Sequence, residues 1–190
     1  MKKIGMVLLA AGSSKRYQGI KLLDIIDGKQ MYLHILELAG QLKISPKIIV
    51  TQYDEIEKKA LEYDFTAVRN EEPERGISRS IQLGLQKALE EDPDLEGILF
   101  SVCDQPYLTL ATLEHLIAAF DISDKSMASV SYHGVLGNPC IIGSKYFMEL
   151  RSLEGDVGGK KIISKFPNDV ESVPVEDEKE LADIDQKESL

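Results

Sequence analysis

Short apolar runs and stretches of helical period alternate along almost the whole chain. Ile4–Ala10, Lys47–Thr51 and Ile98–Val102 have the length and the apolar character of buried strands. The stretches between them carry apolar side chains three and four residues apart, as at positions 32–39 and 77–88. Strands that alternate with helices favour a mainly parallel sheet with helices on both faces. The pattern therefore predicts an α/β fold, a three-layer α/β/α arrangement of the Rossmann-like type.

Turn residues and periodicity define the remaining expected elements. Asp54, with Glu57 three residues later, resembles a capping box at the start of a short helix. His133-Gly134 separates two strand-like runs, as in a hairpin or at a sheet edge. The expected strands in these parts are 65–69, 127–132, 135–142 and 170–175, and the expected helices are 29–43, 77–92, 110–120, 144–153 and one from near 157.

Composition limits the class of protein. The 190 residues show no internal repeat and no low-complexity linker, so we expect one domain over residues 1–190 with its last few residues loose. Hydrophobic residues make up 43% and charged residues 28%, the balance of a soluble globular protein. The longest apolar runs, such as Met6–Ala11, are too short to cross a bilayer. The N-terminus does not have the pattern of a signal peptide.

Cysteine usage and charge narrow the expected compartment and partners. Cys103 and Cys140 each lie inside an apolar run, which favours buried free thiols over a disulfide and predicts a cytoplasmic protein. A net charge of −10 argues against a nucleic-acid surface, which needs a basic stripe. A small polyanionic substrate needs only a local basic pocket. We therefore expect no nucleic-acid and no membrane partner.

The loop after the first strand combines small residues with cations. Leu9 and Ala10 end the strand, residues 11–14 are small, and Lys15, Arg16 and Lys21 follow. Small side chains let backbone N–H groups approach phosphate oxygens, and the cations neutralise their charge. The loop has neither a Walker A pattern nor a G-x-G-x-x-G pattern. On its residues alone it fits a solvated loop as well as a phosphate site.

Two further loops present polar groups at the expected carboxyl edge of the sheet. Gly76 and Ser78 stand where a helix begins, which suits either an ordinary N-cap by Ser78 or a site for an anion or a base edge. Asp104 follows a buried strand that Pro106 ends sharply. It could begin a turn, but Mg²⁺ prefers one or two carboxylates together with substrate phosphates. Asp104 is therefore the best candidate metal ligand in the sequence.

The remaining candidates lie in the last third of the chain. Asn138 precedes Pro139 within the expected hairpin, and Gly155–Lys160 reads as a turn leading into a helix. Asp156 suits an N-cap as well as an active-site carboxylate. Asp185 belongs to an acidic tail, and its composition favours a solvated segment. The three histidines have no ligand-like spacing, and we assign none of them chemistry.

The first loop resembles a known signature, L-A-A-G-x-S-x-R-(M/F)-G-x-x-K, of the MobA-like NTP-transferase family. That family includes molybdopterin guanylyl- and cytidylyltransferases and has the nucleotide-diphospho-sugar transferase fold. One position departs from the signature, because Gln18 stands where the pattern has glycine and the glycine is Gly19. The resemblance implies that this loop wraps a triphosphate, with Arg16 and Lys21 on the phosphates. The matching residues are Leu9, Ala10, Ala11, Gly12, Ser14, Arg16 and Lys21.

The other motifs also resemble that family, and the resemblance implies roles for their residues. Asn70–Ser80 is similar to a segment that lies against the nucleotide, and Cys103-Asp104-Gln105-Pro106 to a motif whose aspartate holds magnesium. The closing segment resembles a D-[IV]-D-T-P-E-D motif that is cut short here. The implied nucleotide-binding residues are 9–12, Ser13, Ser14, Arg16, Lys21, Gly76, Ser78 and Ser80; the acceptor-binding residues are Asn138, Asp156 and Lys160; the metal ligands are Asp104 and Asp185; and the catalytic residues are Arg16, Lys21 and Asp104.

The implied reaction is Mg²⁺-dependent transfer of CMP from CTP to the phosphate of molybdopterin, with release of pyrophosphate. The Ala10-Ala11-Gly12 form resembles the cytidylyl branch, whereas guanylyl enzymes usually have a second glycine there. Alternatives are a guanylyltransferase that uses GTP, transfer to another phosphorylated metabolite, and a non-catalytic carrier of molybdenum cofactor. A molybdenum hydroxylase apoenzyme or its accessory protein is a further expected partner.

Overall fold

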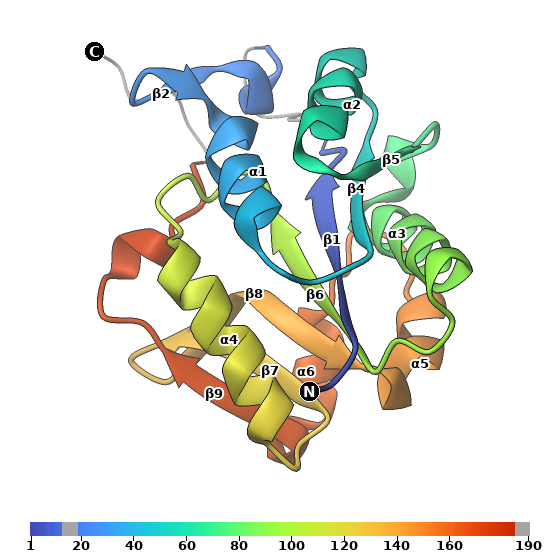
Figure 1. Cartoon of the computed structure of the whole chain (residues 1–190), viewed down its shortest axis with the longest axis vertical. Coiled ribbons are helices and arrows are strands. Elements are labelled where there is room, and N and C mark those ends of the chain that lie inside the picture. Colours follow the sequence, from blue (N-terminus) through green and yellow to red (C-terminus); the bar gives the residue numbers. More distant parts are fainter. Residues whose placement is uncertain (13–18, 185–190) are drawn as a thin grey trace.

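The computed structural model describes residues 1–12 and 19–184, and its centre is a seven-stranded sheet (Figure 1). The strand order is β5-β4-β1-β6-β8-β7-β9. The pairs β4–β5, β1–β4, β1–β6 and β7–β9 are parallel, whereas β8 runs antiparallel to both β6 and β7. The strands are β1 Ile4–Ala10, β4 Lys47–Thr51, β5 Thr66–Arg69, β6 Gly97–Val102, β7 Met127–Tyr132, β8 Val135–Gly143 and β9 Val170–Pro174.

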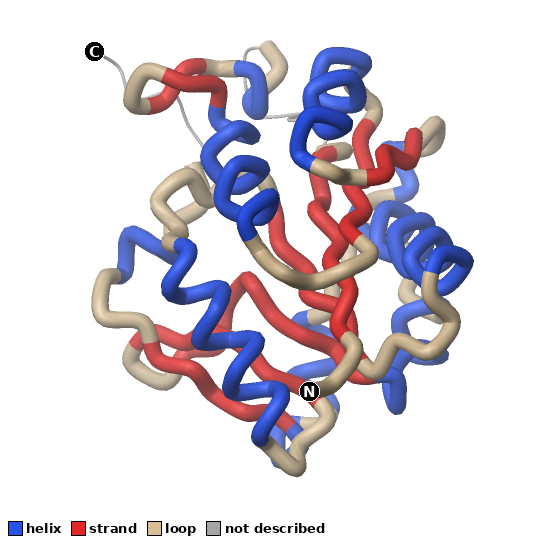
Figure 2. Tube along the Cα trace, viewed as in Figure 1, coloured by secondary structure: helices blue, strands red, loops and turns tan. Residues whose placement is uncertain are grey.

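Helices cover both faces of the sheet, as Figure 2 shows. On one face α1, α2 and α4 pack over side chains such as Leu8 of β1. On the other face α3, α5 and α6 pack over side chains such as Val7. Neighbouring residues of β1 thus enter different cores, which is why this strand is apolar at almost every position. The helices are α1 Met31–Gln41, α2 Asp54–Ala60, α3 Ile77–Glu91, α4 Leu110–Ile122, α5 Phe147–Arg151 and α6 Lys160–Lys165.

This architecture confirms the predicted three-layer α/β/α fold and most of the expected elements. The expected hairpin is also present, as β7 and β8. A two-stranded ribbon, β2 Ile25–Ile26 with β3 Lys29–Gln30, precedes α1 and carries no strong periodic signal in the sequence. The helix expected from near residue 157 begins at Lys160.

The predicted capping box at Asp54 is wrong. Helix α2 begins at Asp54 itself, and its N-cap residue is Tyr53, which makes no side-chain capping bond. The Asp54 carboxylate pairs instead with the Arg69 guanidinium at the end of β5. A long-range ion pair therefore takes the carboxylate that a local cap would have used.

Register brings the ends of three parallel strands together. Ala10 of β1 lies opposite Thr51 of β4, and Leu9 lies opposite Val102 of β6. The loops that leave these three strands consequently begin side by side, at the edge where ligands bind in open α/β sheets. Within the described ranges, no helix combines the length and the apolar character needed to cross a membrane.

Candidate active site

The first loop is anchored through its backbone carbonyl groups. The carbonyl oxygens of residues 10–12 each accept a hydrogen bond from a side chain at the end of β4. Thr51 Oγ1 donates at 3.0 Å, Gln52 Nε2 at 2.8 Å and the Tyr53 hydroxyl at 2.7 Å. These bonds hold residues 10–12 against the end of β4. The beginning of the first loop is therefore fixed in place.

Lys21 and Asp104 join the first and third loops. Lys21 Nζ donates to Asp104 Oδ2 at 2.8 Å, and the lysine is only 8% exposed. Lys21 starts a 3-10 turn over Lys21–Leu23, while Asp104 lies just beyond β6. A buried ammonium is stable only when it is paired, so the contact holds the two loops together.

The second oxygen of Asp104 is left over. Asp104 Oδ1 is buried, and no residue within 1–12 and 19–184 makes a hydrogen bond to it. The same ranges contain no group of three or more acidic, histidine or cysteine side chains that could hold a metal ion. A cation at Asp104 would therefore need further ligands from substrate or water, as Mg²⁺ commonly does.

The second and fourth loops pack on each other. Gly76 has φ +83°, and a Cβ atom there would lie 2.5 Å from the carbonyl carbon of Gly155. The backbone N–H of Ser78 donates to the Gly155 carbonyl oxygen at 3.2 Å. Gly76, rather than Ser78, is the N-cap residue of α3, which corrects the capping alternative for Ser78. The glycine is needed because two backbones approach each other closely here.

Ser80 and Asp156 also lie near the contact between the start of α3 and the Gly155 turn. Ser80 is buried, and its hydroxyl oxygen accepts a hydrogen bond from Asn70 Nδ2 at 3.0 Å. Asp156 directly follows Gly155, so it lies beside the start of α3. Asp156 is not among the residues that line the cavity described next, although Asn138 and Lys160 are. The three predicted acceptor residues are thus divided between two places.

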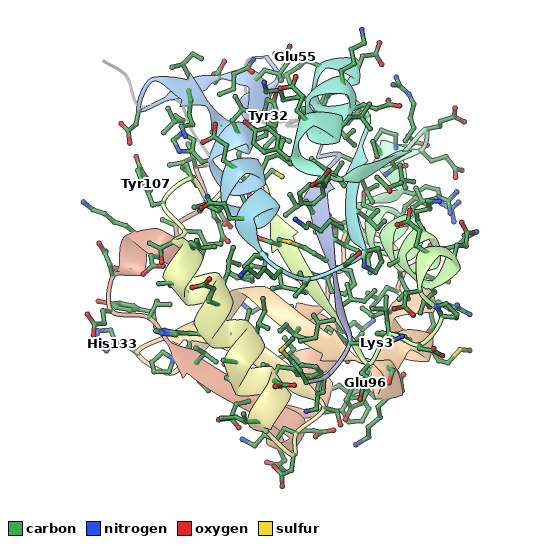
Figure 3. The ribbon with its side chains drawn as sticks, in the orientation of Figure 1. Lys3, Tyr32, Glu55, Glu96, Tyr107 and His133 are labelled. Carbon is green, nitrogen blue, oxygen red and sulfur yellow. The ribbon has the colours of Figure 1, made fainter. Side chains whose placement is uncertain are left out.

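A cavity of about 850 Å³ lies between the β7–β8 hairpin and the segment Glu178–Asp183. Asn138 and Lys160 line it, together with Gln105 of the third loop. His133, at the tip of the hairpin, also lines it and lies on the same side of the molecule as Tyr107 (Figure 3). Its volume is in the range of small-molecule sites.

The wall formed by Glu178–Asp183 is held at three points. The Glu180 carboxylate accepts hydrogen bonds from Thr109 and Thr112 at the start of α4. The Leu181 carbonyl oxygen accepts from Gln105 Nε2 at 3.1 Å, and the Ile184 N–H donates to the Asp104 carbonyl oxygen at 3.0 Å. The segment 178–184 therefore connects the cavity to the loop that bears Asp104.

Both cysteines are free and buried, as predicted. Burial raises the pKa of the Cys140 thiol to about 12. Burial, and then the charge of Asp104, raise the pKa of the Cys103 thiol well above its usual range. Neither thiol is a nucleophile at neutral pH, although Cys103 lies next to the site.

The described residues include only part of the predicted site. Leu9–Gly12, Lys21 and Asp104 lie at the carboxyl edge of β1 and β6. The predicted residues Ser13, Ser14, Arg16 and Asp185, and the departure at Gln18, lie outside the described residues. Thr51, Gln52 and Tyr53 were not predicted, because their role depends on the pairing of β1 with β4.

Comparison with known proteins places the chain in a family. Residues 6–171 match the model of the MobA-like NTP transferase domain. The purine catabolism protein PucB of Bacillus subtilis is 27% identical over 96% of this chain and 91% of its own length. A probable molybdenum cofactor guanylyltransferase of Pyrococcus horikoshii is 26% identical over 100% of this chain and 98% of its own length.

Solved structures share the fold. Rv0371c of Mycobacterium tuberculosis H37Rv superposes with a TM-score of 0.78 at 23% identity, covering 98% of this chain and 95% of that one. A structure of Rv0371c described as a complex with manganese superposes with a TM-score of 0.70 at 22% identity, covering 92% and 89%. The family match covers most of the chain, including the first three motif loops. The chain thus belongs to the MobA-like NTP transferase domain family and is a nucleotidyltransferase.

Proposed function

We propose that the protein transfers CMP from CTP to the phosphate of molybdopterin, with Mg²⁺ as cofactor and pyrophosphate as the second product. The observation that carries the proposal is the approach of Lys21 to Asp104 at 2.8 Å, beside the strip of small residues 10–12. One edge of the sheet then holds three groups: the Lys21 ammonium for phosphates, the Asp104 carboxylate for a metal, and the small residues 10–12. Phosphoryl chemistry depends on such positioning and charge neutralisation.

The residues present fit a divalent cation. Asp104 offers a buried oxygen that no described residue satisfies, and such an atom suits a hard cation. We propose Asp104 as a ligand and Asp185 as a second. The manganese complex of Rv0371c supports a divalent ion in this fold. When bound, the ion neutralises charge that develops on the phosphates.

The chain's own side chains would do the rest of the work by binding and orienting the substrates. Lys21 and Arg16 hold the triphosphate, while Lys160 and Asn138 hold the acceptor in the cavity. An acceptor phosphate oxygen attacks the α-phosphorus in line, and the bond from that phosphorus to the pyrophosphate oxygen breaks. The acceptor phosphate is already ionised, so no protein base has to remove a proton. Catalysis then comes from proximity and electrostatics.

Ala11 supports CTP over GTP. The residue is buried directly after β1, and the resemblance to the cytidylyl branch rests on this alanine where guanylyl enzymes usually have a second glycine. GTP is the second candidate, because the similar protein of Pyrococcus horikoshii is named a probable guanylyltransferase.

Two alternatives remain. The protein could transfer the nucleotide to another phosphorylated metabolite, or it could be a non-catalytic carrier of molybdenum cofactor. The juxtaposed Lys21 and Asp104 support catalysis over carriage. We also propose that residues 1–190 act as one cytoplasmic domain that passes its product to a molybdenum hydroxylase apoenzyme or its accessory protein.

Pyrophosphate release separates these possibilities. The purified protein is incubated with molybdopterin, Mg²⁺ and each of the four nucleoside triphosphates in turn. We expect rapid release with CTP and slower release with GTP. Faster release with GTP would replace the cytidylyl assignment with a guanylyl one. Binding of molybdopterin without release from any triphosphate would favour the carrier.

A further inference from the structure

Gln105 carries a buried polar atom that no described residue satisfies. The side chain directly follows Asp104 and is 3% exposed. Its Oε1 has no hydrogen-bond partner within residues 1–12 and 19–184. A buried acceptor without a donor destabilises the protein that contains it, so such an atom calls for an explanation. A ligand that supplies the missing donor is one.

The neighbouring backbone determines which end of the amide is unsatisfied. Gln105 Nε2 donates to the carbonyl oxygen of Leu181 at 3.1 Å. A carbonyl oxygen can only accept, so the amino group of the amide must face Leu181. The oxygen is consequently the end that is left for another partner, and rotating the amide would break an existing bond.

Gln105 lines the cavity of about 850 Å³ that also contains Asn138 and Lys160. Lys160 can bind an anionic group, whereas the unsatisfied carbonyl can only accept a hydrogen bond. The two side chains thus offer complementary groups to different parts of one molecule. Apolar side chains such as Leu136 and Ile163 supply the remaining contacts.

We propose that Gln105 selects the acceptor, because its Oε1 accepts a hydrogen bond from an N–H or O–H group of that molecule. The acceptor class is then a phosphate monoester that also carries a hydrogen-bond donor away from its phosphate. An analogue with only acceptors at that position leaves the carbonyl unpaired and binds more weakly. The inference rests on the proposed nucleotidyl transfer for its reaction, but the hydrogen bond concerns the cavity alone.

The test replaces Gln105 by methionine, which has a similar length and no amide. With molybdopterin as the acceptor probe, Gln105→Met should raise the KM for molybdopterin about tenfold and leave the KM for CTP unchanged. The melting temperature of the ligand-free protein should fall only slightly, because the loss of the bond to Leu181 is partly offset by the removal of an unsatisfied buried carbonyl.

Gln82→Met is the matched control. Gln82 Nε2 donates to the carbonyl oxygens of Arg151 at 3.0 Å and Leu153 at 2.8 Å, and it holds α3 to the end of α5 away from the cavity. This substitution should lower the melting temperature and leave transfer to molybdopterin unchanged. The two variants are thus expected to show opposite patterns.

Each result decides the inference. An unchanged KM for molybdopterin in Gln105→Met would overturn it, and so would a loss of melting temperature as large as that of Gln82→Met. If the wild-type protein transfers nothing to molybdopterin, the proposed acceptor is wrong independently of Gln105. The ligand-free melting temperatures then decide: a loss in Gln105→Met smaller than that in Gln82→Met supports a ligand contact, and an equal or larger loss removes it.

Discussion

The Lys21–Asp104 ion pair joins two side chains that are 83 positions apart in the sequence. One carboxylate oxygen bonds the lysine, and the other is buried without a partner among the described residues. Asp104 can therefore bond the Lys21 ammonium through Oδ2 and still offer Oδ1 to a metal ion. Its position follows from β6, which delivers the residue to the carboxyl edge of the sheet.

Asp104→Asn is expected to lower kcat for nucleotidyl transfer at least about a hundredfold, because the amide has no charge to offer a divalent cation. The amide oxygen can still accept a hydrogen bond from Lys21 Nζ, but the buried ammonium loses its counter-charge, so the native fold should form with a lower free energy of unfolding. Pyrophosphate release measures the loss, and circular dichroism checks the fold. Asp94→Asn, on the exposed surface beside Lys3, is the control and should keep full activity. Equal rates in both variants would remove Asp104 from the mechanism.

Asp104 could be predicted from the sequence, whereas the residues that anchor the first loop could not. An apolar strand followed by a carboxylate and Pro106 is a local signal. Thr51, Gln52 and Tyr53 look like ordinary turn residues after a strand, and their bonds to residues 10–12 exist only because β1 pairs with β4 in one register. The pairing of β1 with β4 cannot be derived from the residue types at positions 51–53.

At the scale of elements, the start of α3 and the Gly155 turn form one unit. Gly76 has a positive φ and lies against the Gly155 backbone, and the Ser78 N–H donates to the Gly155 carbonyl oxygen. The predicted nucleotide loop and one predicted acceptor loop are thus packed together. Movement of one loop would require movement of the other.

Gly76→Ala is expected to lower the free energy of unfolding by at least about 2 kcal/mol, because a Cβ atom adds a clash with backbone to an unfavourable φ. Urea unfolding followed by circular dichroism measures the change. Gly134→Ala is the matched comparison: its φ is +81°, but a Cβ atom there meets nothing within 4 Å. It should lose only about 1 kcal/mol. Similar losses in the two variants would show that the close approach contributes little.

Turns and helix starts could be predicted where the signal lay in adjacent residues. The predictions were wrong where a residue distant in the sequence bonded the same side chain. The β7–β8 hairpin was readable from His133-Gly134, because a positive φ at both residues forms a tight turn. The capping box predicted at Asp54 is absent because Arg69, at the end of β5, pairs with the carboxylate. The segment 178–184 shows only acidic composition in sequence, yet its bonds to Thr109, Gln105 and Asp104 make it a wall of the cavity.

At the scale of the whole molecule, the parallel strands around β1 carry the edge proposed for the triphosphate, and β8, β7 and β9 extend the same sheet. Periodicity predicted the strands and the layers, but not that β8 would insert between β6 and β7. That order depends on which strand edges pair, and short apolar strands can pair in several orders. The family resemblance added the nucleotide-diphospho-sugar transferase type, which periodicity alone does not specify.

Asp169 ties the outer strands to the rest of the fold. Its carboxylate accepts hydrogen bonds from Lys145 Nζ at 2.7 Å, the Tyr146 hydroxyl at 2.6 Å and the Ser126 N–H at 2.8 Å. The bonds from Lys145 and then Tyr146 hold the pKa of the Asp169 carboxyl well below its usual range. The charged carboxylate therefore stabilises the folded protein above the unfolded-state pKa of about 4.

Asp169→Asn is expected to lower the free energy of unfolding at pH 7 by about 1–3 kcal/mol, because a neutral amide accepts these bonds more weakly. The difference from wild type should shrink as the pH falls below about 4, where the wild-type carboxyl begins to lose this stabilisation. Unfolding curves of both proteins between pH 3 and pH 7 measure it. A difference that stayed constant over that range would show that the charge of Asp169 does not matter.

The fate of the α-phosphate distinguishes nucleotidyl transfer from mere binding of the two substrates. The protein is incubated with Mg²⁺, molybdopterin and CTP labelled with ³²P at the α-phosphate. We predict that the label appears in molybdopterin, with one pyrophosphate released for each label transferred, and that Asp104→Asn transfers almost none. Label that remained in CTP while molybdopterin stayed bound would contradict the account.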